Sequence, residues 1–178
     1  NWDTNAVPGS LDRVVIADTA NDPVANIDVN IAELTINTDA VLDMASRDLT
    51  TTGGVTNNGR LRLDGSATLS IGGTRTNGPA STIEYTSPGS PVWGSNYQNL
   101  EINTAGSITA GADLIINGNL IRASGDLSLA AYGLSVAGNM THSAGSLTSS
   151  GTITLFGGSN QSLDFSNTNL NNVTINKS

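Results

Sequence analysis

The chain contains no cysteine, a single lysine (Lys177) and few aromatic residues. The lack of cysteine excludes disulfides, thiolate catalysis and cysteine-ligated metals. Because aromatic residues make up only 4 % of the chain, a core has to be built from thin aliphatic layers. No apolar run approaches the ~20 residues of a membrane-spanning helix, so we expect no membrane insertion.

Positive charge is also scarce, since seven Lys and Arg stand against 15 Asp and Glu, for a formal net charge of −8. Nucleic acids and anionic lipids both require a positive field, so neither is an expected partner. The abundant residues are Gly (20), Asn (21) and Thr (21), which favour turns and strands over helices. Such a composition is typical of a bacterial secreted or surface protein.

A short strand-like phrase occurs three times, as "LTIN" at 34–37, "LEIN" at 100–103 and "VTIN" at 173–176. The sequence between the first two of these strands is repeated at the same distance along the chain, since "GRLRL" at 59–63 matches "GDLSL" at 125–129. This indicates a unit of 66–73 residues, divided into turns of about 20–27 residues that each hold two or three short strands with alternating apolar residues.

Because similar residues recur in register, the sequence predicts an all-β fold, namely a single-stranded parallel β-helix (β-solenoid) of about 7–8 turns. In this fold each strand pairs with its counterpart one turn later. Ile36, Ile102 and Ile175 would then lie in one inner column. The alternative is an antiparallel β-sandwich, because Asn-Gly steps begin at residues 58, 77 and 117 and favour tight hairpins. We expect a capping segment with the first strand at 1–24 and solenoid repeats at 25–178, with units starting near residues 32, 98 and 171.

Two long segments, "TIEY…YQNLEINTAGSITAGADLIINGNL" and "TITLFGGSNQSLDF…NNVTIN", resemble the right-handed parallel β-helix repeats of bacterial secreted and surface proteins, the haemagglutinin- and adhesin-like stalks. The resemblance implies an extracellular or cell-surface location and a structural or adhesive function. It supplies no catalytic residue. Functions of other classes are a carbohydrate-binding module and, less favoured, a β-helix polysaccharide lyase.

For carbohydrate binding, the candidate residues are Trp93 and Tyr97, which could form an aromatic platform for cell-surface glycans. The competing interpretation places Trp93 in the core, because the offset between the two copies of the repeat aligns it with Leu163. For a lyase, the available carboxylates are Asp43, Asp48, Glu84 and Glu101, and the possible bases are Arg60 and Arg62. The arginines alternate with leucines, which is typical of an ordinary outward face, so we predict that the chain is not an enzyme and has no catalytic residue.

Oxygen ligands are densest in "ADTANDPVANID" at 17–28, where Asp18, Asn21, Asp22 and Asp28 are candidates for a calcium site. The spacing matches no known calcium loop, and an acidic loop is the alternative. No other cofactor is expected, because the single histidine, His142, has no second histidine or cysteine with which to bind a transition metal.

The two ends of a parallel coil have unpaired backbone groups that attract further strands. Trp2 and Pro8 are expected to cap the N-terminal end. Val173 and Ile175 form a strand with no cap after it, so we expect either continuation into further repeats or end-to-end self-association, which would build a filament.

Overall fold

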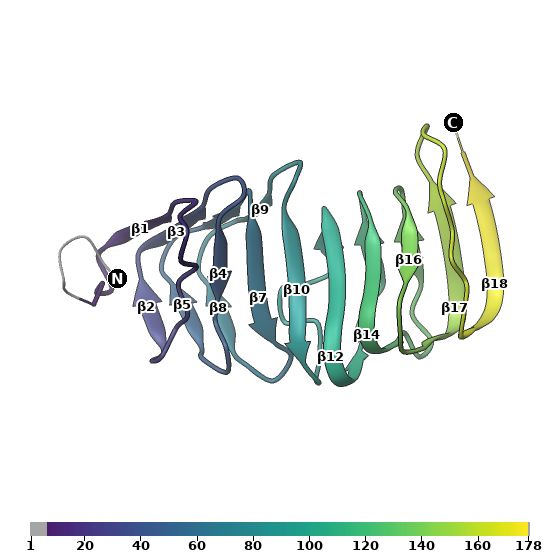
Figure 1. Ribbon diagram of the computed structural model, residues 1–178, viewed down its shortest axis with the longest axis horizontal. Coiled ribbons are helices and arrows are strands. Elements are labelled where there is room, and N and C mark those ends of the chain that lie inside the picture. The colour runs from purple at the N-terminus through teal and green to yellow at the C-terminus, as the bar shows by residue number, and fades with distance from the viewer. Residues whose placement is uncertain (1–6, 178) are drawn as a thin grey trace.

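The computed structural model describes residues 7–177, and these form an all-β rod in which parallel strands stack over about eight turns (Figure 1). The first and last described strands, β1 (Arg13–Ile16) and β18 (Thr168–Asn176), lie at opposite ends of the rod. No helix long and apolar enough to cross a membrane occurs among the described residues. The fold is therefore the parallel β-solenoid, and the antiparallel sandwich is excluded because the described strands pair in parallel throughout.

Each turn has three sides, here called faces A, B and C. Face A contains β1 (Arg13–Ile16), β3 (Glu33–Ile36), β6 (Val55–Asn57), β9 (Arg75–Asn77), β11 (Asn96–Tyr97), β13 (Leu114–Ile116) and β15 (Leu134–Val136). Face B contains β4 (Val41–Asp43), β7 (Arg60–Asp64), β10 (Thr82–Ser87) and β16 (Met140–His142). Face C contains β2 (Val29–Ile31), β5 (Leu49–Thr51) and β8 (Leu69–Ile71).

Four longer strands bend around a corner and belong to two faces. They are β12 (Asn99–Thr109) and β14 (Leu120–Ser128), which run from face B to face C, and β17 (Leu147–Phe156) and β18 (Thr168–Asn176), which run from face C to face A. The bend explains why β17 pairs with β14 through Leu147 and with β15 through Ile153.

The length of a turn differs from the sequence prediction. On face A paired residues are 19 to 21 positions apart, as in Ile16 with Ile36, and on face B the step varies from 17 to 23. A turn is therefore about 20 residues long, and some turns are shorter than the predicted range of 20–27 residues. The longest predicted steps were too long because they joined strands on different faces, such as Ile36 on β3 and Leu63 on β7.

The three isoleucines do not share one column, which corrects the prediction. Ile36 lies on face A, Ile102 lies on face B where it pairs with Tyr85, and Ile175 lies on face A of the last layer. The four-residue strand sequence recurs because strands on all three faces need the same alternation of inward apolar and outward polar residues. Sequence similarity between strands therefore reveals a common environment without revealing the face.

The core is a set of aliphatic columns inside the coil. On face B, Leu100, Leu120 and Met140 stack in successive turns, and each is at most 1 % exposed. Full burial of such a side chain stabilises the fold by roughly 1.5–3 kcal/mol. Since every inner residue is covered by the turns before and after it, the stability of one layer depends on its neighbours.

Asparagine and aspartate side chains connect successive turns at the corners. Asn99 Oδ1 accepts the backbone N–H of Asn119 at 2.9 Å, and Asn119 Oδ1 accepts that of Asn139 at 2.8 Å. Aspartates do the same at other corners, in the pairs Asp48–Thr68, Asp113–Gly133 and Asp126–Ser146. The Asn-Gly steps also lie at corners between strands of different faces, and none forms a hairpin.

This ladder of side chains predicts the effect of Asn119→Ala. The variant leaves the Asn139 N–H without its acceptor, so we expect the free energy of unfolding in urea to fall by about 1 kcal/mol. Asn119→Asp is the matched control, because a carboxylate oxygen can still accept the bond. Equal stability losses in the two variants would contradict this account of the corner.

Candidate functional site

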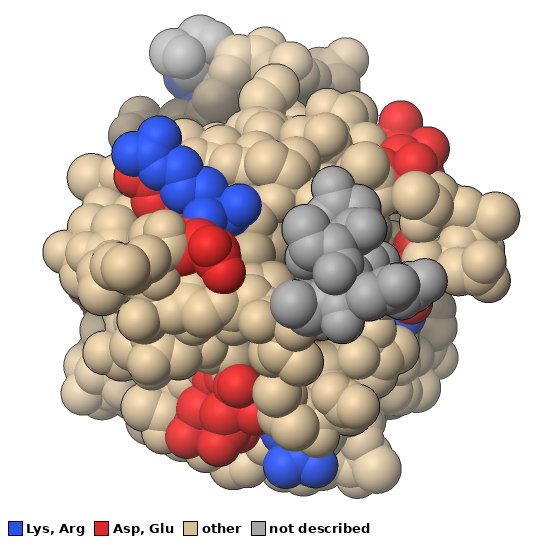
Figure 2. All heavy atoms as spheres, turned by 90° about the vertical axis from the view of Figure 1, so that its left-hand side faces the viewer, with Lys and Arg blue, Asp and Glu red and all other residues tan. Residues whose placement is uncertain are grey.

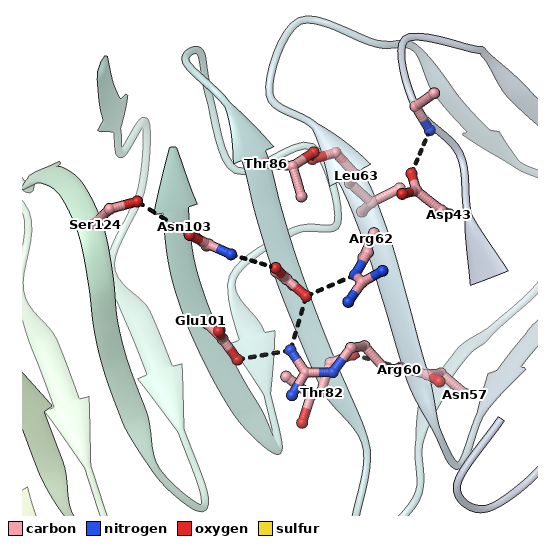
Figure 3. A network of polar contacts seen from close by, with 12 residues as sticks. Asp43, Asn57, Arg60, Arg62, Leu63, Thr82, Thr86, Glu101, Asn103 and Ser124 are labelled. Carbon is pink, nitrogen blue, oxygen red and sulfur yellow. Dashed lines mark hydrogen bonds and ion pairs between the residues drawn. The ribbon is translucent and has the colours of Figure 1, made fainter. Parts of the chain in front are cut away.

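The largest cluster of interacting charges lies on the outer side of face B (Figure 3). Arg60 and Arg62 come from β7, Glu84 from β10, and Glu101 and Asn103 from β12. The register places Arg62 beside Glu84 and Glu84 beside Glu101, so three successive turns contribute one outward position each. We call these five residues the charge network.

Glu84 is the centre of the network. Its Oε2 accepts hydrogen bonds from Arg60 Nη1 at 2.8 Å and from Arg62 Nε at 3.0 Å, and its Oε1 accepts one from Asn103 Nδ2 at 2.8 Å. Arg60 Nη1 also donates to Glu101 Oε2 at 2.6 Å. One guanidinium thereby neutralises two neighbouring carboxylates that would otherwise repel each other.

The surrounding side chains bury Glu84 to 3 % exposure, whereas Arg60 and Arg62 remain about one third exposed, at 31 % and 36 %. Burial is the largest influence on the pKa of Glu84 and raises it, but the hydrogen bonds from Asn103, Arg60 and Arg62 together hold this pKa below its usual value. For Arg60, burial lowers the pKa, while the bonds to Glu101 and Glu84 outweigh burial and raise it. Both groups are therefore held in their charged forms.

The structure corrects the prediction that these charges are scattered along an ordinary outward face. They meet in one hydrogen-bonded network with a buried centre. An arginine that acts as a base needs a lowered pKa, and a carboxyl group that acts as an acid needs a raised pKa. In the network the pKa of Arg60 is raised and that of Glu84 is lowered. The charges therefore serve to hold three neighbouring turns together. The other lyase carboxylates, Asp43 and Asp48, accept backbone N–H groups at corners.

Sequence reasoning missed the network because it used the wrong turn length. Arg62 pairs with Glu84, and Glu84 pairs with Glu101, so each step of one turn brings the next charge onto the neighbouring layer. A recurrence of opposite charge at the interval of one turn was the available signal.

The aromatic candidates are buried. Trp93 is 2 % exposed and Tyr97 is fully buried, and Tyr97 Oη donates to the Gly94 carbonyl at 2.6 Å. Tyr85 Oη accepts the Trp93 N–H at 3.0 Å, and burial raises the pKa of Tyr85 to about 12. The two rings therefore offer no stacking platform, which corrects the carbohydrate interpretation based on them.

The core placement of Trp93 is right, although the alignment that suggested it is wrong. Leu163 pairs with Met140 on face B, in the column of Leu100 and Leu120. Trp93 instead belongs to the segment between β10 and β11, next to Arg75.

The calcium candidates do not form a visible centre. Asp18, Asn21, Asp22 and Asp28 are exposed, and Asp28 Oδ1 accepts the N–H of Asp48 at 3.1 Å. Within residues 7–177, no three His, Cys, Asp or Glu side chains gather as a metal-binding group. His142 ends β16, and its Nε2 lies 2.9 Å from the Gly145 carbonyl oxygen.

The two ends of the rod differ in exposure. Trp2 lies outside the described residues and Pro8 is partly buried, while the inward side chains of β1, Val14 and Ile16, are 8 % and 5 % exposed. In the last layer, Val173 and Ile175 are 46 % and 71 % exposed. Figure 2 looks at the N-terminal end and shows the charged side chains in a few small groups around the rim.

Comparisons with protein-family models, curated proteins and solved structures gave no match to this chain. The parallel β-solenoid therefore stands on the structure itself. A relationship to adhesin-like stalks stays a prediction.

The charge network predicts an acid-sensitive fold. Because the pKa of Glu84 is lowered in the folded state, its ionised form stabilises the protein above the ordinary carboxyl pKa of 4.5, and this contribution is lost as the pH falls through the lowered value. Glu84→Gln should lower the free energy of unfolding at pH 7 by about 2 kcal/mol, and its stability should fall less steeply below pH 4.5.

Urea unfolding measured across this pH range tests the expectation. Glu33→Gln is the control, because Glu33 is 46 % exposed and pairs with the exposed Arg13 at 3.3 Å, so its removal should change little. If both variants keep the full acid dependence of the parent chain, Glu84 is not its source.

Proposed function

We propose that the chain is a structural module, the β-solenoid of an extracellular or cell-surface stalk or the subunit of a filament formed by end-to-end stacking. The observation that carries the proposal is the parallel ladder itself, which continues on face B from β4 to β16 with steps of 17 to 23 residues. Eight layers at ~4.8 Å give a rod of about 38 Å. Such a rod separates two attachment points without bending.

The interior supports a mechanical function. Aliphatic columns fill the coil from Val14 to Leu155, and hydrogen bonds between side chains and backbone join the corners of neighbouring turns. Force along the rod would be shared by many parallel backbone bonds and by the packing of each layer on the next. The charge network adds a further link between three turns.

The terminal layer supports association with another β-strand. β18 pairs with β17 on one side, and its Val173 and Ile175 expose apolar surface that a following layer would cover. That layer would come from further repeats in the same polypeptide or from a second copy.

Sedimentation velocity and electron microscopy over a range of concentrations test the filament form. We expect dimers or fibres of the parent chain and a monomeric Ile175→Lys variant, because a lysine at the contact cannot be buried cheaply. Ile115→Lys on the side of the rod, where Ile115 is 41 % exposed, is the matched control and should still assemble. A parent chain that stays monomeric at high concentration would remove the filament form and leave the stalk.

A further inference from the structure

The ladder on face A is interrupted once among the described turns. β9 is the last strand of the four-stranded sheet, and β11, one turn later, begins the eleven-stranded sheet. In β9, Arg75 and Asn77 pair with Val55 and Asn57, in columns that hold aliphatic residues in several other turns. The three-stranded sheet of face C ends in the same turn, at β8.

Side chains replace the missing backbone bonds. Asn77 Nδ2 donates to the Asn96 carbonyl at 2.9 Å, and Arg75 Nη1 donates to the carbonyls of Trp93 and Val92. One amide side chain thus spans the gap between β9 and β11. The gap is therefore too narrow for an inserted β-strand, which would need ~4.8 Å on either side.

A hollow of about 480 Å³ opens over this interruption, and its size is in the range of roughly 300–1,000 Å³ that small-ligand sites occupy. Its lining is polar and includes Thr76, Ser95, Gln98 and Asn117. Asn77 Oδ1, at the same place, is buried and has no hydrogen-bond donor among the described residues. A ligand cannot reach this buried oxygen, whereas Gln98 lines the hollow and its amide makes no side-chain hydrogen bond to the described residues.

From this geometry we infer that the hollow binds a neutral oligosaccharide. Amide and hydroxyl side chains both donate and accept hydrogen bonds, as sugar hydroxyls do, and the amide of Gln98 is available to a ligand hydroxyl. The one charged group in the lining, Arg75, already donates to the carbonyls of Leu69, Val92 and Trp93, and its guanidinium carbon lies 5.9 Å from the Trp93 ring centre. The net charge of −8 disfavours acidic polymers.

The inference goes beyond a spacer function, because the hollow lies on the side of the rod and is independent of its ends. It also differs from recognition by exposed aromatic rings, since Trp93 is only 2 % exposed and forms part of the floor. Recognition by amides alone is weak, so we expect a Kd of roughly 0.1–1 mM.

Titration of the chain with soluble neutral oligosaccharides of glucose, mannose and galactose, followed by amide chemical shifts and calorimetry, tests the inference. Uronic-acid oligomers form the second arm. At least one neutral ligand should bind with shifts confined to residues 75–77 and 93–98 and to Asn117. Gln98→Ala should weaken binding about tenfold, because it removes an amide that makes no other side-chain hydrogen bond to the described residues.

Ser135→Ala is the matched control, since Ser135 faces outward on face A two turns beyond β11 and should not affect binding. A thermal melt confirms that both variants fold. Absence of binding to every neutral ligand, binding to acidic oligomers only, shifts elsewhere on the rod, or equal affinity of Gln98→Ala and the parent chain would each overturn the inference.

Discussion

The stacking of each turn on the one before it, through parallel backbone hydrogen bonds, is the constraint on which the whole structure depends. Parallel backbone bonds fix the distance between layers, and this brings like residues into contact in columns. Aliphatic columns then form the core, and asparagine or aspartate side chains at the corners form hydrogen bonds to the next turn. The environment of a residue in such a coil is therefore set more by its neighbours one turn away than by its neighbours along the chain.

The same constraint explains both unusual places in the rod. The charge network forms because three outward positions in successive turns carry Arg62, Glu84 and Glu101, and stacking brings them together. The hollow lies where stacking is incomplete. The ladder on face A breaks after Arg75 and Asn77, and side chains of β9 connect to the next turn in place of backbone bonds. One site strengthens the coil, and the other is a local failure of stacking that leaves polar groups available.

Much of the fold was predictable from local patterns. Short alternating strands such as "RLRLD" and "DLSLA", Asn and Gly at turns, and recurrence in phase point to a parallel coil, because each turn must present the same inward and outward surfaces. The site was less predictable. Trp93 was a candidate both for sugar binding and for the core, since a solitary aromatic residue gives no sign of whether it points inward, and the structure buries it at 2 % exposure.

The sequence by itself determined the architecture: strands of period two, no helix and a coil of about eight turns, because these follow from the alternation and spacing of residues. Only the tertiary structure decided the register, that is, which residues of successive turns lie next to each other. Whether Ile102 stacks over Ile36, whether Arg60 reaches Glu84, and where the ladder breaks all depend on corner lengths, which vary the step between layers. A small change in the length of a corner alters which residues of successive turns lie next to each other. Local secondary-structure propensities contain no information about that change.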